Sequence, residues 1–200
     1  MSLHSQKLAW LATLAVYAAL CLPVARHWLE ASMTMQMLVQ FPLLISTGWI
    51  VGINLRHRAT GWLDEFNEYG ITGIILVTVV TSVWMLPFML DLAATNVMVD
   101  AWKYLTLPLL VGVPMALSWP RMGFVLRGVF VSEFIAMFFR LGWLYLILPS
   151  RVCNNYLLDD QQVSGKLMLG IGIVLVLVVA IKLIWGRFDH LETSNIVHEN

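Results

Sequence analysis

The stretch between Lys166 and Lys182 contains no charged residue, and it is one of several long apolar segments in this sequence. A helix that crosses the hydrocarbon core of a bilayer needs about 20 mainly apolar residues, whereas a soluble domain must cover its surface with polar groups. Of the 200 residues, 60% are hydrophobic and only 12% are charged, which is about half the charged fraction of soluble domains. We therefore expect an integral membrane protein, with the lipid bilayer as its main environment.

Six segments are long and apolar enough for one membrane-spanning helix each: Leu8–Val24, Ser32–Leu55, Gly70–Leu90, Ala101–Trp119, Gly123–Leu148 and Lys166–Trp185. None alternates apolar and polar residues as a spanning β-strand would. Because backbone groups in lipid must be satisfied within their own segment, we predict an all-α protein. Residues 1–200 are expected to form a single transmembrane domain, a bundle of six helices. Five helices is the alternative, if the short first segment lies along the membrane surface.

The distribution of basic residues predicts the orientation of this bundle. With six spans, the side that holds both termini receives seven of them: Lys7, Arg56, Arg58, Arg121, Arg127, Lys182 and Arg187. The opposite side receives four: Arg26, Lys103, Arg151 and Lys166. Cytoplasmic connections carry the excess of Lys and Arg, so we expect both termini in the cytoplasm. The formal net charge is zero, which gives no reason to expect a nucleic-acid partner.

Two charged residues, Glu133 and Arg140, lie well inside the fifth predicted span. They are seven residues apart, so they point to nearly the same side of the helix, about 10.5 Å apart along its axis. Ionised side chains in a bilayer usually face the protein interior. We expect both residues to face the bundle, each with a partner on another helix and without direct contact between them. Two roles stay open: a proton or ion relay, or buried charges that fix helix packing.

A stripe of methionine and glutamine begins the second predicted span, with four residues on one helical face: Met33, Gln36, Met37 and Gln40. Thioethers are soft ligands that suit Cu(I). His27 and Cys153 are predicted on the same outer side of the membrane. One interpretation is a copper site that takes its ligands from Met33, Met37, His27 and Cys153. The other is ordinary packing, in which methionine fills gaps and glutamine bonds between helices.

The motifs of the common enzyme classes are missing from the sequence. It has no HExxH, no phosphate-binding glycine-rich loop, no CxxC pair and no serine-nucleophile motif. All five histidines fall in predicted loops or tails, so two histidines cannot hold a haem at membrane depth. We therefore expect a protein that is not an enzyme, with copper as the one cofactor that the sequence suggests.

The start of the second span resembles a known family. The residues concerned are Arg26-His27-Trp28-Leu29-Glu30, followed by Met33-x-x-Gln36-Met37-Leu38-Val39-Gln40-Phe41-Pro42. They are similar to a helix of CtaG-type cytochrome oxidase assembly proteins, in which His precedes Met-Leu and Pro follows; here Gln36 stands at the His position.

The resemblance implies an accessory subunit or assembly factor for a copper-containing membrane enzyme. That enzyme would be a terminal oxidase of the respiratory chain or a membrane monooxygenase, and its other subunits in the bacterial inner membrane would be the partners. Two alternatives stay open. In the first, the chain is a structural subunit of some other membrane complex; in the second, it is a small transporter that uses Glu133 and Arg140.

Overall fold

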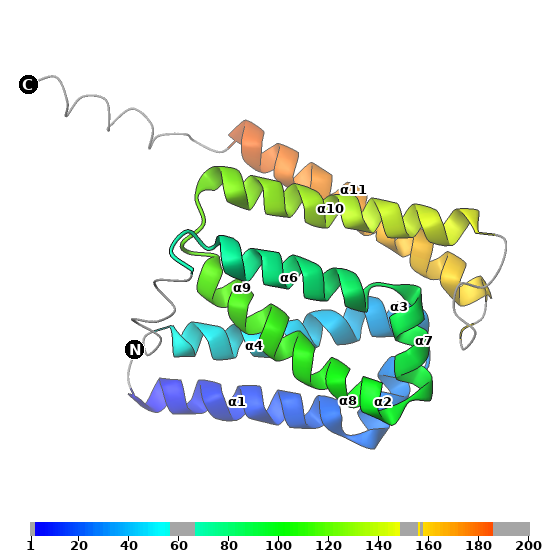
Figure 1. Cartoon of the computed structure of the whole chain (residues 1–200), viewed down its shortest axis with the longest axis horizontal. Coiled ribbons are helices and arrows are strands. Elements are labelled where there is room, and N and C mark those ends of the chain that lie inside the picture. The colour runs from blue at the N-terminus through cyan, green and yellow to red at the C-terminus, as the bar shows by residue number, and fades with distance from the viewer. Residues whose placement is uncertain (1–2, 57–66, 149–155, 157, 186–200) are drawn as a thin grey trace, which may run out of the picture.

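The computed structural model describes residues 3–56, 67–148, 156 and 158–185, with side chains from Trp10 onward. Every regular element in these ranges is helical, which confirms the all-α prediction. Figure 1 shows the longer helices lying side by side along the long axis of the molecule, with the short helices α2, α3 and α7 gathered at one end. The predicted Cys153 ligand lies outside the described residues.

The chain forms the following elements in order: α1 (Leu3–Cys21), α2 (Pro23–Glu30), α3 (Met33–Met35), η1 (Gln36–Gln40), α4 (Phe41–Leu55), α6 (Ile71–Trp84), α7 (Pro87–Thr95), α8 (Val97–Thr106), η2 (Leu107–Gly112), α9 (Val113–Ser118), α10 (Phe124–Ile147) and α11 (Leu158–Trp185). The elements η1 and η2 are π-helical turns inside longer helices. Such wider turns are uncommon and occur frequently at functional sites.

Three continuous helices are long and apolar enough to cross a membrane: Met33–Leu55, Val97–Ser118 and Leu158–Trp185. Two of the predicted spans are bent pairs of helices, since α2 turns by 67° from α1 and α7 turns by 66° from α6. Each second helix begins with a proline, Pro23 or Pro87, which cannot continue the hydrogen bonds of the helix before it. By length and composition, the described residues thus include three helices that could cross a membrane, or up to five if each bent pair is one span.

The surface of the bundle is apolar, and several polar side chains are buried inside it. Large apolar residues are exposed on the outer faces of the helices, among them Leu14, Val79, Val129, Val174 and Ile181. The buried polar residues include Gln36, Gln40, Asp100, Lys103 and Gln161. Water disfavours such a surface, whereas lipid chains accept it. This distribution and the apolar helices identify the chain as a membrane protein.

Two helices approach each other closely where α4 crosses η2. A Cβ atom on Gly48 would overlap the backbone of Pro108, and one on Gly52 would lie 2.7 Å from Ala116 Cβ. Across the same contact, a Cβ on Gly112 would lie 2.7 Å from Gly48 Cα. Small residues four apart allow helices to pack with their backbones nearly in contact, which is a common packing mode in membranes. This crossing holds the centre of the bundle together.

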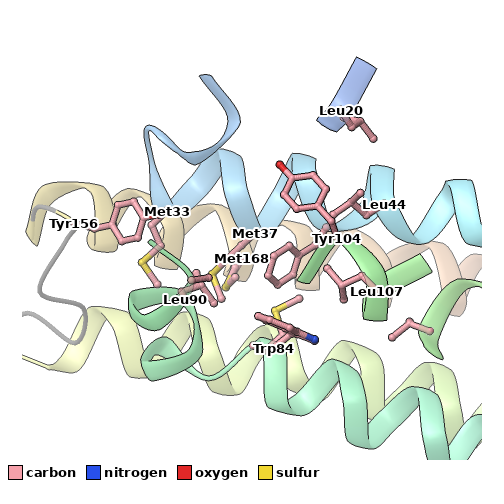
Figure 2. Close-up of a cluster of buried hydrophobic side chains, with 14 of the residues drawn as sticks. Leu20, Met33, Met37, Leu44, Trp84, Leu90, Tyr104, Leu107, Tyr156 and Met168 are labelled. Carbon is pink, nitrogen blue, oxygen red and sulfur yellow. The ribbon is translucent and has the colours of Figure 1, made fainter. Parts of the chain in front are cut away.

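The hydrophobic core runs along the inside of the bundle next to this crossing. Figure 2 shows Met33, Met37, Met168 and Leu90 towards one end of the core, and Leu44 and Leu107 further along it. These side chains come from α3, η1, α4, α7, η2 and α11. The core therefore joins the first, middle and last parts of the chain.

Candidate functional site

A cluster of charged and polar side chains lies where α2, η1 and α8 meet. Its members, which we call the corner cluster, are Arg26, Glu30, Gln40, Asp100, Lys103 and Tyr104. The bend after α1 turns α2 across the end of the bundle. The side chain of Asn96 caps α8 by accepting a hydrogen bond from Met98 N at 2.9 Å, and it sets the start of the helix that carries Asp100 and Lys103.

Two acidic and two basic side chains balance each other in the corner cluster. Lys103 Nζ lies 2.9 Å from Glu30 Oε1 and 2.7 Å from Asp100 Oδ1, and its side chain is only 1% exposed. Arg26 forms an ion pair with Asp100, and its Nε atom lies 4.0 Å from Glu30 Oε1. A buried charge is tolerated only when it is paired and hydrogen-bonded. The four groups form ion pairs with one another, and their formal charges sum to zero.

Hydrogen bonds from neutral side chains complete the cluster. Glu30 Oε1 accepts from Gln40 Nε2 at 3.0 Å and from the Tyr104 hydroxyl at 3.0 Å. Gln40 Nε2 also donates to the Tyr104 hydroxyl oxygen at 2.6 Å. The guanidinium of Arg26 lies 4.9 Å from the centre of the Tyr104 ring, within cation–π distance. These bonds tie the π-helical turn η1 to α2 and α8, so the cluster fixes the relative positions of three helices.

The sequence prediction did not include the corner cluster, apart from Gln40. Arg26 and Glu30 are four residues apart, and Asp100 and Lys103 are three apart. Opposite charges at these spacings lie on one helical face. This spacing was the one indication in the sequence that each helix carries a pair of opposite charges, but it could not show that the two pairs contact each other. The contact between the two pairs brings together residues far apart in the sequence: Lys103 and Glu30, which share a hydrogen bond, are 73 positions apart.

The other glutamine of the stripe has a partner at the start of the last helix. The Tyr156 hydroxyl donates to Gln36 Oε1 at 2.6 Å and lies 3.3 Å from the Glu30 backbone oxygen. Next to it, Asp160 Oδ2 accepts from Met33 N at 2.6 Å and so caps the beginning of α3. Both glutamines are therefore buried and bonded to other elements, and the start of α11 is attached to the same end of the bundle as the corner cluster.

The predicted copper ligands occupy different environments. Met33 and Met37 are 0% and 1% exposed and belong to the hydrophobic core (Figure 2). The Tyr145 hydroxyl lies 3.7 Å from Met37 Sδ and donates a hydrogen bond to it. His27 is an exposed residue of α2. Among the described residues, no group of three or more His, Cys, Asp or Glu side chains could hold a metal ion.

The expected arrangement of Glu133 and Arg140 is wrong on two points. First, the two side chains contact each other directly, as an ion pair along α10. Helical side chains lean toward the N-terminus, so Arg140 extends back toward Glu133 and covers the two turns between them. Second, neither is buried in the bundle: the Arg140 side chain is 63% exposed, and the Glu133 side chain, which lines a cavity between α10 and the helices α4 and α6, is 50% exposed. The buried face of α10, which includes Gly142 and Tyr145, lies on another side of the helix.

Two cavities border the bundle interior. One, of about 280 Å³, lies between α1 and the α4–η2 crossing and includes Tyr17, Gly48 and Pro108 in its lining. The other, of about 230 Å³, lies between α10 and the helices α4 and α6, where Phe130 and Glu133 line it. Apolar side chains form most of both walls, which suits hydrocarbon groups better than polar solutes.

Comparison of this chain with protein families, with curated proteins and with solved structures finds no match. The corner cluster, the buried methionines and the exposed ion pair of α10 are therefore the features from which a function can be argued.

Proposed function

We propose that this chain is a non-catalytic accessory subunit or assembly factor in a membrane-protein complex, located in a bacterial inner membrane. The observation that supports this proposal most is the closed corner cluster. Its four ionised side chains are paired with one another, so they stabilise a helix arrangement instead of presenting a charge to a substrate. A transporter has less support, because at least half of each side chain of the Glu133–Arg140 pair is exposed, and of the two only Glu133 lines either of the cavities described above.

A copper-containing enzyme, either a terminal oxidase or a membrane monooxygenase, is the partner that we propose. This part rests on the resemblance of residues 26–42 to CtaG-type assembly proteins. The test is deletion of the gene in the source organism. We expect one membrane copper enzyme to lose metal content and activity, and a plasmid copy to restore both. Unchanged metal content in every membrane copper enzyme of the deletion strain would contradict the choice of partner.

Copper binding by the chain itself is a second proposal, supported by thioether groups gathered in one core, those of Met33, Met37 and Met168 (Figure 2). We expect the purified protein to retain Cu(I) and the Met33→Leu/Met37→Leu variant to lose it, because soft thioethers prefer this ion. Cu(I) retention after desalting is the measurement. Met98→Leu is the matched control, since Met98 is 74% exposed. Equal retention in the double variant, or none in the wild type, would assign the methionines to packing alone.

Six spans with both termini in the cytoplasm is the topology that we propose. The packing of α10 along α11 supports a crossing by α10, because Gly142 lies against Gly165 and Phe139 lies against Gly172. The seven-to-four division of basic residues supports the orientation. Reporter fusions after Asn200 and inside the connection between α10 and α11, at residues 149–157, should report opposite sides of the membrane, with the fusion after Asn200 in the cytoplasm. Two reporters on the same side would remove the last span, and an external C-terminus would reverse the orientation.

A further inference from the structure

We propose that two copies of this chain associate through the exposed face of α10. The exposed ion pair between Glu133 and Arg140 belongs to a longer stripe on this face. The stripe contains Val129, Glu133, Ala136, Arg140, Trp143 and Ile147. Its spacings of four and three residues alternate, which is the pattern of the a and d positions at the seam of a left-handed helix pair. The proposal does not depend on the proposed role in copper-enzyme assembly, but it rests on the proposed crossing of the membrane by α10.

The depth of the ion pair makes its exposure unfavourable in a single copy. The helices α10 and α11 run antiparallel, as the contacts of Gly142 with Gly165 and of Phe139 with Gly172 show. If this antiparallel pairing is extended along both helices at the normal rise per residue, Glu133 lies at about the same position along the bundle axis as Val176, and Arg140 at about the same position as Leu169. Both levels lie in the stretch of α11 that carries no charge. Charged groups at such depth are stabilised by burial against protein, not by contact with lipid chains.

A second copy fits this face because the face is complementary to itself. All copies of a membrane protein share one topology, so two α10 helices related by a two-fold axis along the membrane normal run parallel and keep equal residues at equal depth. Glu133 and Arg140 already meet within one chain. The two-fold axis therefore brings two such pairs together at one level, where the carboxylates and guanidiniums of the two copies can alternate. Four groups that alternate in sign stabilise one another and leave no net charge in the interface.

Small residues beside the charges permit close approach of the two helices. Gly128, Ser132 and Ala136 are small, and small residues at a contact let helix backbones approach closely in membranes. A Cβ atom on Gly128 would meet nothing within 4 Å, so this part of α10 is open. Among the described elements, α10 packs mainly on α11. Glu133 borders the cavity towards α4 and α6, and the exposed side chains of Val129, Arg140, Trp143 and Ile147 leave room for another helix along the stripe.

Disulfide cross-linking in native membranes tests the interface with the wild-type charges in place. In a Cys21→Ser/Cys153→Ser background, Ala136→Cys should form a cross-linked dimer on mild oxidation, because Ala136 lies on the seam. Val174→Cys is the control, since Val174 is 58% exposed on α11 and lies outside the stripe. We expect at least about tenfold more dimer from Ala136→Cys. A monomer, equal dimer from both positions, or cross-links to a different protein would each overturn the proposal.

Charge reversal in the Ala136→Cys chain tests the role of the ion pair. Glu133→Arg gives each chain two positive groups on the stripe, and Arg140→Glu gives each chain two negative groups, so each variant expressed alone should lose most of its cross-linked dimer. Co-expression of the two, with different tags, should restore a mixed dimer, because the opposite charges then meet between copies. Undiminished dimer from Glu133→Arg alone would overturn the proposal. Absence of the mixed dimer, when both chains are present in the membrane, would do the same.

Discussion

Replacing Gly48 by alanine should be among the most destabilising single changes in this chain. The added Cβ would overlap the backbone of Pro108 in η2, and backbone atoms of two packed helices cannot move aside as a flexible side chain can. Overpacking a tight contact typically costs 1–3 kcal/mol and occasionally more, and we expect about 3 kcal/mol or more here. Thermal unfolding of the purified protein in detergent is the measurement, with loss of folded protein in membranes as the extreme outcome.

Two further variants decide whether this effect comes from the α4–η2 crossing. Gly170→Ala in α11 is the matched control, because a Cβ atom there would meet nothing within 4 Å; alanine should leave stability unchanged or raise it by up to about 1 kcal/mol. Gly112→Ala lies on the same crossing and should resemble Gly48→Ala. The double variant of Gly48 and Gly112 should cost less than the sum of the two, since both separate the same helices. Equal stability of Gly48→Ala and Gly170→Ala would contradict the described packing.

Replacing Lys103 by methionine should have a comparable effect through a different cause. The change keeps most of the side-chain volume but removes the cation that pairs with Glu30 and Asp100. Breaking a buried ion pair by removing one partner typically costs about 3–5 kcal/mol, because the remaining charge stays buried without compensation. We expect a loss of this size in the free energy of unfolding, measured by the same thermal or denaturant method.

The charge-based explanation has its own controls. Lys166→Met removes an exposed lysine of α11 and should change stability by no more than about 0.5 kcal/mol. Adding Glu30→Gln to Lys103→Met should recover part of the loss, because it neutralises the carboxylate that has lost its nearest cation and leaves Asp100 paired with Arg26. If the free energy of unfolding is the same for Lys103→Met as for Lys166→Met, the corner cluster does not stabilise the bundle.

The helices could be predicted from the sequence to a large extent because bilayer thickness sets their length. The second, fourth and sixth predicted spans correspond to Met33–Leu55, Val97–Ser118 and Leu158–Trp185. The sixth starts earlier than predicted, because Asp160 bonds to the start of α3 and the first turns of α11 pack there. The first and third are bent at Pro23 and Pro87, residues whose effect on helix direction depends on what the next turns pack against.

The candidate site could be predicted only in part. Helical spacing placed Gln36 and Gln40 on one face correctly, since that relation is local to one helix. Their partners Tyr156 and Tyr104 are 120 and 64 positions away, and local spacing gives no information on such pairs. The same limit explains the error at Glu133 and Arg140. Their common side of α10 followed from the sequence, but whether that side faces the bundle depends on how α10 packs against α11.

The sequence by itself thus determined the all-helical class and the membrane environment, because both follow from the length of its apolar segments and the scarcity of charge. Tertiary structure alone decided which polar groups are buried together. Four charged residues from two separate helices form one cluster, while Glu133 and Arg140, which were predicted to face the bundle, form an exposed ion pair on α10. The physical reason is that burial of a charge is favourable only with a partner, and packing brings that partner from a distant part of the chain.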